Sequence, residues 1–185
     1  FIAALDGLWG QESYSLDGAF FKIKDGRLAT RTMTKPRPPI FAASGAELGK
    51  DVIARYCDTW FIAHAPGLAA YESNALAIAA DIKDMRERAG RHGRSLGYGL
   101  STYVICAPTM ALAEAEAAEL DQIPEATVAA KALGAGLVGT PQVIAERIRR
   151  YEDMGLDCLM LQFHPMREGL ETFAREIMPL IRPKG

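Results

Sequence analysis

The sequence lacks a basic surplus, and it lacks any long uninterrupted apolar run. Its 185 residues carry 21 Lys and Arg against 23 Asp and Glu, which gives a formal net charge of -2. Nucleic-acid-binding proteins usually carry a clear positive excess, and a helix that spans a bilayer needs about 18 consecutive apolar residues. The composition therefore predicts a globular protein with no nucleic-acid partner and no membrane segment.

Cysteine is also scarce. Cys57, Cys106 and Cys158 are odd in number and form no C-x-x-C pair. This pattern favours buried free thiols in the reducing cytoplasm over a disulfide framework. The closely spaced His and Cys residues that hold zinc are missing as well, so we expect no metal site.

An initiating Met is absent too. The chain starts at Phe1, and the spacing of Ile2, Leu5 and Leu8 predicts an amphipathic helix from the first residues onward. We therefore expect the sequence to be the later part of a longer protein. The next predicted feature is a hairpin over 14–23, because Asp17-Gly18 is a two-residue turn signal.

Beyond residue 39, short apolar segments alternate with helical segments. The predicted strands show no polar alternation, which is typical of parallel strands covered on both faces. This alternation of strands and helices predicts consecutive β/α units of an α/β protein. The predicted strands cover 40–43, 59–62, 97–106 and 158–161, and the predicted helices cover 44–56, 68–89, 108–120, 140–154 and 167–181.

Two of these helices begin at recognisable caps. Ser44 precedes Glu47 by three residues, which is the spacing of a capping box. Thr140 precedes Pro141, a residue favoured at the first helical position. The segment 121–138 fits the alternation of strands and helices poorly and is predicted to contain a short Ala-rich helix. It is either a loop insertion or, near 121–126, a place where residues are missing from the sequence.

Several segments resemble the bacterial-luciferase-like family of flavin-dependent monooxygenases. The strand and turn at 38–45 read PPIFAASG, the segment 137–148 reads LVGTPQVIAERI, and the closing segment 173–180 reads FAREIMPL. The hairpin around Asp17-Gly18 is similar to that of the dimethyl-sulfone and alkanesulfonate monooxygenase branch. The resemblance implies a (β/α)8 TIM barrel, a fold with eight strands and about 250 residues. Residues 1–185 would then form a single domain that supplies the last four β/α units, with the N-terminal half of the barrel absent.

In such a barrel the site lies at the carboxyl ends of the strands. Ser44, Gly45 and Ala46 follow the first predicted strand and open a helix, whose amides and dipole suit a phosphate. The resemblance implies that this turn holds the phosphate of FMN. Plain helix capping by Ser44 is the alternative.

Five further residues are candidates for the chemistry. His64, Tyr103 and His164 lie at or near strand ends and are candidate catalytic residues, although each also has a structural interpretation. Ser101 and Phe163 are candidate substrate contacts. Relatives that act on alkanesulfonates have an arginine where this chain has Ser101, and serine cannot pair with a sulfonate. Because the predicted strand ends offer no Lys or Arg except Arg167, we expect a neutral sulfone as substrate.

The resemblance implies an enzyme of the two-component type. Reduced FMN, supplied by a separate NAD(P)H-dependent flavin reductase, would react with O2 to oxygenate a small organosulfur compound, a sulfone or sulfonate, and cleave a C–S bond. A homo-oligomer, dimer or tetramer, is expected. The alternatives are an F420-dependent oxidoreductase of the same superfamily and a flavin-binding paralogue without turnover.

Overall fold

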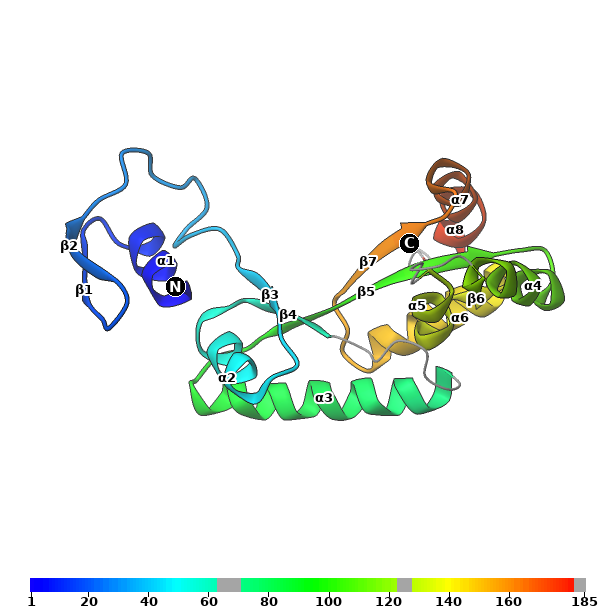
Figure 1. Ribbon diagram of the computed structural model, residues 1–185, viewed down its shortest axis with the longest axis horizontal. Coiled ribbons are helices and arrows are strands. Elements are labelled where there is room, and N and C mark those ends of the chain that lie inside the picture. Colours follow the sequence, from blue (N-terminus) through cyan, green and yellow to red (C-terminus); the bar gives the residue numbers. More distant parts are fainter. Residues whose placement is uncertain (63–70, 123–127, 182–185) are drawn as a thin grey trace.

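The computed structural model describes residues 1–62, 71–122 and 128–181, and its centre is a mainly parallel sheet (Figure 1). Four strands form the body of the sheet: β3 (Phe41–Ala43), β4 (Thr59–Ile62), β5 (Gly97–Cys106) and β7 (Cys158–Phe163). All three neighbouring pairs, β3–β4, β4–β5 and β5–β7, run parallel. The prediction of four adjacent parallel strands in chain order is therefore confirmed.

One further strand was not predicted. β6 (Val138–Gly139) is only two residues long and pairs in parallel with the last two residues of β5. It begins at residue 138, the last residue of the segment that fitted the sequence pattern poorly. A two-residue strand leaves no detectable periodicity, which explains why the sequence did not indicate it.

An N-terminal portion precedes the sheet and lies at one end of the molecule (Figure 1). It consists of helix α1 (Ile2–Gly10) and an antiparallel hairpin of β1 (Tyr14–Asp17) and β2 (Lys22–Gly26). The predicted hairpin is confirmed, but its turn is longer than predicted. Asp17 pairs with Lys22, and the amide of Gly18 donates to the carbonyl of Phe21, so the connection spans four residues.

Arg37 ties this N-terminal portion to the sheet. Its side chain is almost buried and donates to the carboxylates of Asp6 on α1 and Asp58 before β4, both at 2.5 Å. It also donates to the carbonyl of Tyr56 at 3.0 Å. Burial disfavours ionisation of Asp58, but the hydrogen bonds from Arg37 and the Ile40 amide outweigh this effect and lower its pKa.

Helices cover one face of the sheet and form the main core. They are α2 (Glu47–Tyr56), α3 (Tyr71–Arg91), α6 (Pro141–Asp153) and a closing helical segment. That segment was predicted as one helix, but a π-helical turn (Phe173–Ile177) separates α7 (Met166–Thr172) from α8 (Met178–Ile181). A second small core joins α4 (Met110–Asp121) and α5 (Val128–Ala135) to the end of β5.

Side chains alternate between the two faces of the strands. Trp60, Leu100 and Val104 point into the helix-covered core. Phe61, Ser101 and Met160 belong to the other set and line a common pocket. We call this second side of the sheet the pocket face. No helix within the described ranges is long and apolar enough to cross a membrane.

Candidate functional site

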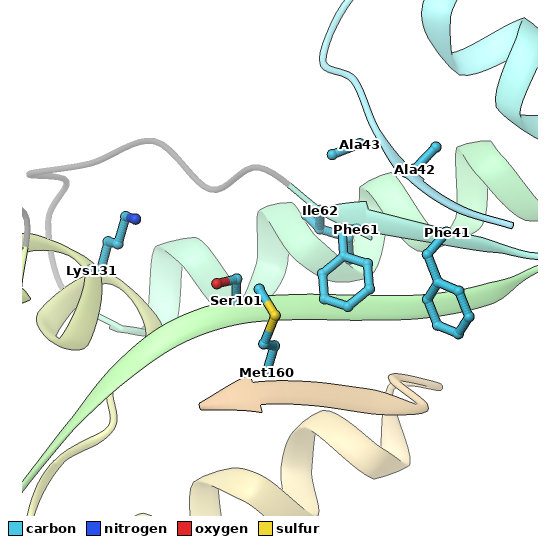
Figure 2. Close-up of a pocket in the computed structure, with 8 residues that line it drawn as sticks. All are labelled: Phe41, Ala42, Ala43, Phe61, Ile62, Ser101, Lys131 and Met160. Carbon is cyan, nitrogen blue, oxygen red and sulfur yellow. The ribbon is translucent and has the colours of Figure 1, made fainter. Parts of the chain in front are cut away.

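A pocket of about 440 Å³ lies on the pocket face of the sheet. Figure 2 shows the side chains around it, which come from β3, β4, β5, β7 and helix α5. Such a volume is within the usual range for small-molecule sites. The lining residues are Phe41, Ala42, Ala43, Phe61, Ile62, Ser101, Lys131 and Met160.

Two aromatic rings form the apolar end of the pocket. The rings of Phe41 and Phe61 lie 6.1 Å apart, centroid to centroid, and they stand side by side in Figure 2. Gly99 makes room for the Phe61 ring, because a Cβ at this position would lie 2.8 Å from it. An apolar group of a ligand therefore has a preformed surface to contact on this side.

Ser101 and Lys131 supply the polar end. Ser101 pairs in register with Met160, and in Figure 2 its hydroxyl lies on the side of the pocket that faces Lys131. The Lys131 ammonium also lies 6.0 Å from the centre of the Tyr103 ring. A hydroxyl and a cation at one end of an apolar pocket suit a ligand with a small apolar body and oxygen atoms at one end.

Lys131 contradicts the expectation that Arg167 would be the sole cation at the strand ends. The hydroxyl of the fully buried Thr102 donates to the Lys131 carbonyl at 2.9 Å and so fixes helix α5 beside β5. Sequence reasoning missed this residue because it belongs to a helix distant from Ser101 in the chain. The neutral-substrate prediction loses the premise on which it rested.

The turn Ser44–Gly45–Ala46 follows β3 directly and therefore begins beside the pocket residue Ala43. The predicted capping box is wrong. Helix α2 begins at Glu47, its N-cap is Ala46, and no described side chain caps its first turn. The hydroxyl of Ser44 instead accepts a hydrogen bond from the amide of Ala46 at 3.2 Å.

Space and charge around this turn suit an anion. A Cβ on Gly45 would meet nothing within 4 Å, so a ligand can approach its backbone closely. Glu47 would repel an anion, but Arg88 binds its carboxylate at 2.5 Å. The ion pair draws the Glu47 charge toward α3, which leaves the positive end of the α2 dipole available.

Of the two candidate histidines, the structure describes only His164, which does not line the pocket. His64 lies outside the described residues. His164 is exposed just beyond the end of β7. Glu116 on α4 is near enough to sense it: burial and Glu119 raise the pKa of Glu116, and His164 lowers it by a smaller amount. Burial likewise raises the pKa of Cys106, on β5, to about 11, which keeps its thiol protonated near neutral pH.

Tyr103 and Phe163 occupy opposite faces. Tyr103 lies on the same side of β5 as Ser101, one step closer to the carboxyl end, and packs against the small core of α4 and α5. Phe163 packs against the helix-covered core, with its ring 5.6 Å from that of Phe173. Phe163 is therefore a packing residue in this arrangement and does not line the pocket with Ser101.

No group of three His, Cys, Asp or Glu side chains with metal-binding geometry occurs among the described residues. The sequence missed Phe41 and Met160 as well as Lys131 as pocket residues. Phe41 and Met160 could have been found from the alternation of side chains along a strand. In the observed register Phe41 lies on the same face as Phe61, and Met160 lies directly opposite Ser101 on that face.

Comparisons with known proteins agree with this architecture. The chain is 28% identical to an FMNH2-dependent dimethylsulfone monooxygenase of Pseudomonas putida, over 214 aligned residues that include 98% of the chain and 57% of the relative. The structure resembles a riboflavin lyase solved with modified FMN and riboflavin, with a TM-score of 0.71, 19% identity, and coverage of 96% of this chain and 52% of the other.

It also resembles an F420-dependent secondary alcohol dehydrogenase in complex with an F420-acetone adduct, with a TM-score of 0.65 and 16% identity over 98% of this chain and 60% of the other. The chain thus spans little more than half the length of the proteins it matches. The four strands have the fold of part of a luciferase-like TIM barrel. Since the model of the luciferase-like monooxygenase family matches residues 1–158, the chain belongs to that family.

Proposed function

We propose that this chain is the second half of the barrel of a two-component monooxygenase that uses reduced FMN and O2 to oxygenate a small organosulfur compound. One observation carries the proposal: a pocket that is apolar except for Ser101 and Lys131 lies beside a turn suited to a phosphate. The similarity to a dimethylsulfone monooxygenase along nearly the whole chain supports the sulfur compound as substrate.

The turn Ser44–Gly45–Ala46 and the first turn of α2 would hold the FMN phosphate. The open space at Gly45 and the pairing of Glu47 with Arg88 fit this role. When bound, reduced FMN supplies the electrons with which one oxygen atom of O2 enters the substrate and the other leaves as water. The tasks of the protein are to orient the reactants and to exclude bulk water.

The pocket residues would bind the organosulfur substrate. Phe41, Phe61 and Met160 contact its alkyl group, and Ser101 and Lys131 bind the oxygen atoms on sulfur. Both a sulfone and a sulfonate carry such oxygens, and Lys131 offers a counter-charge to the latter. His64, Tyr103 and His164 remain proposed catalytic residues, for which proton transfer to or from the reacting centre is the natural role.

The proposal is tested with the complete reading frame and a flavin reductase that uses NAD(P)H. Reduced FMN should bind in an anaerobic fluorescence titration, and substrate-dependent O2 consumption should accompany release of sulfinate or sulfite. Gly45→Asp places a carboxylate in the phosphate site and should weaken binding of reduced FMN at least tenfold. The matched control is Gly10→Asp on α1, where a Cβ also meets nothing within 4 Å.

The same assay separates the alternatives. Oxidation of an alcohol or another hydride donor by F420 without O2 would favour the F420-dependent oxidoreductase, whose fold is shared. Binding of reduced flavin without any substrate-dependent O2 consumption would identify a paralogue without turnover. Unchanged flavin affinity in Gly45→Asp would remove the turn after β3 from the site.

A further inference from the structure

Met160 brings a sulfur atom of the protein itself into the pocket proposed for a sulfur compound. It is 49% exposed and lines the pocket together with Phe61 and Ser101. Met160 pairs in register with Ser101, and Figure 2 shows its side chain extending from β7 toward that residue. The thioether of Met160 is therefore open to whatever enters or forms in the pocket.

The position of Met160 distinguishes it from the other methionines. All seven methionines lie among the described residues, and Met160 alone of them lines this pocket. Met85 is fully buried, whereas Met33 and Met166 are more exposed than Met160, at 97% and 75%. An oxidant in bulk water would react first at Met33 and Met166, because methionine oxidation follows accessibility. Preferential oxidation of Met160 would require an oxidant that forms inside the pocket.

We propose that Met160 is a site of self-oxygenation, at which the thioether becomes a sulfoxide when reduced FMN and O2 react while no sulfur substrate fills the pocket. This inference rests on the proposed function. A thioether is an organosulfur group with a polarizable sulfur, so it belongs to the same broad chemical class as the proposed substrate. Because Met160 is part of the pocket wall, it is present at every turnover, and a bound substrate shields it.

The co-reactant is a peroxide formed from O2. Reduced FMN gives two electrons and two protons to O2, which yields oxidised FMN and hydrogen peroxide. The sulfur lone pair of Met160 forms a bond to one peroxide oxygen, the O–O bond breaks, and the other oxygen leaves as water. The thioether is thereby oxidised to the sulfoxide and the peroxide is reduced.

Oxidation would change the pocket as well as the residue. A sulfoxide is polar and accepts hydrogen bonds, whereas the thioether is apolar. Phe41, Phe61 and Met160 form the apolar surface proposed to contact the alkyl group of the substrate. Turnover without substrate should therefore weaken later binding of the substrate.

The experiment incubates the complete protein with FMN, a flavin reductase, NAD(P)H, isotopically labelled O2 and catalase. Mass spectrometry of the methionine peptides then measures the addition of one labelled oxygen atom. Catalase destroys peroxide that escapes into solution, so Met33 and Met166 should remain unmodified. The oxidised fraction at Met160 should exceed that at Met33 by at least about fivefold, which reverses the order set by exposure.

Two further arms test the role of the pocket. Dimethyl sulfone or a short alkanesulfonate, whichever supports O2 consumption, should suppress oxidation of Met160 at saturating concentration. After incubation without substrate, the unmodified protein should show a higher KM than a sample kept without reduced FMN. Met160→Leu, which keeps an apolar side chain but has no sulfur, should show no such rise relative to its own untreated sample. Met33→Leu is the matched control and should show the same rise as the unmodified protein.

The outcomes that overturn the inference are distinct from failure of the proposed function. Oxidation that begins at Met33 and Met166, or that catalase abolishes, would identify free peroxide as the oxidant. An unmodified Met160, or one oxidised equally with and without substrate, would also contradict the inference, as would an equal rise of KM in Met160→Leu. In each case substrate-dependent O2 consumption leaves the proposed function standing. If the protein binds no reduced FMN in an anaerobic titration, the proposed function fails and the role of Met160 fails with it.

Discussion

Lys131 decides which charge the pocket accepts. Its ammonium lies at the polar end of the pocket with Ser101. A desolvated anion needs a matched cation, whereas a neutral sulfone needs only a hydrogen-bond donor. Lys131→Met should therefore lower kcat/KM for a short alkanesulfonate by at least about tenfold, or about 1.4 kcal/mol in the transition state. The value for dimethyl sulfone should change by less than about threefold.

Lys83→Met, at an exposed position on α3, is the matched control for loss of a positive charge. Both kcat/KM values should stay as they are in this variant. An equal loss for the sulfone and the sulfonate in Lys131→Met would contradict a role in charge selection. Lys131 would then act on the flavin or on folding instead.

Asp58 links stability to acid pH through Arg37. The pKa of Asp58 is lowered in the folded protein, so its ionised form stabilises the fold above the usual Asp pKa. That contribution disappears as the pH falls below about 4, through the lowered pKa. Asp58→Asn should reduce the free energy of unfolding at pH 7 by about 1–3 kcal/mol, because it weakens the hydrogen bonds of an almost buried arginine.

Urea denaturation at pH 7 and at pH 3 measures both effects. The difference between the unmodified protein and Asp58→Asn should shrink at the lower pH. Asp17→Asn is the control, since Asp17 forms an exposed ion pair with Lys22 that contributes little. A difference that persists unchanged at pH 3 would show that the charge of Asp58 is not what stabilises the fold.

Helix α2 is shaped by the turn that precedes it. A Cβ on Gly49 would lie 2.1 Å from the Ser44 hydroxyl oxygen, so only glycine leaves that side chain where it is. Gly49→Ala should displace Ser44, break its bond with the Ala46 amide and weaken binding of reduced FMN several-fold. Gly90→Ala on α3 meets nothing within 4 Å and should instead stabilise the protein by about 0.5–1 kcal/mol without affecting FMN.

Anaerobic titration and thermal unfolding of both variants provide the test. If Gly49→Ala binds reduced FMN as tightly as Gly90→Ala does, the orientation of Ser44 is irrelevant to the phosphate. A general loss of folding in Gly49→Ala would be visible as a lower unfolding midpoint. A normal midpoint with weaker flavin binding is the expected combination.

Locally encoded elements were predictable from the sequence, and features set by tertiary contacts were not. The hydroxyl of Thr140 caps α6 by accepting from the Val143 amide, as its position before Pro141 indicates. Ser44 occupies an equivalent sequence pattern but does not cap α2. The Trp60 indole donates to its carbonyl at 3.1 Å, Arg88 binds Glu47, and Ser44 bonds Ala46 instead.

The same distinction applies to the candidate site. Ser101 was predicted because it lies within a recognisable apolar strand and because relatives that act on alkanesulfonates have an arginine at its position. Phe163 faces the helix-covered core because β7 continues to residue 163, two residues beyond its predicted end, so this ring still follows strand alternation. Lys131 reaches the pocket only because Thr102 fixes α5 beside β5. No local pattern encodes that approach.

At the scale of the whole molecule, the sheet has two open edges. β3 pairs with β4 alone and β7 pairs with β5 alone within the described ranges. Large apolar side chains on the pocket face are also exposed, with Phe41 at 53% and Met160 at 49%. Unpaired edges beside apolar surface promote association. Residues 1–185 expressed alone should therefore form dimers or larger species in sedimentation velocity.

Phe41→Lys places a charge on the β3 edge and should shift the population toward monomer, as charges on edge strands do in natural proteins. Lys24→Phe on the hairpin adds an aromatic residue away from the sheet edges and should not. A monodisperse monomer of residues 1–185 would mean that neither open edge needs a partner. The proposal of a half barrel would then lose its physical basis.

The anchoring of α5 through Thr102 has a consequence for how such proteins diversify. The hydroxyl holds the main chain of Lys131, not its side chain, so the backbone position is independent of the residue that occupies it. Replacement of that one side chain changes the electrostatics of the pocket while every strand and every core contact stays in place. Substitution of this side chain, in evolution or by design, can therefore change the selectivity for charged or neutral compounds without changing the core that stabilises the fold.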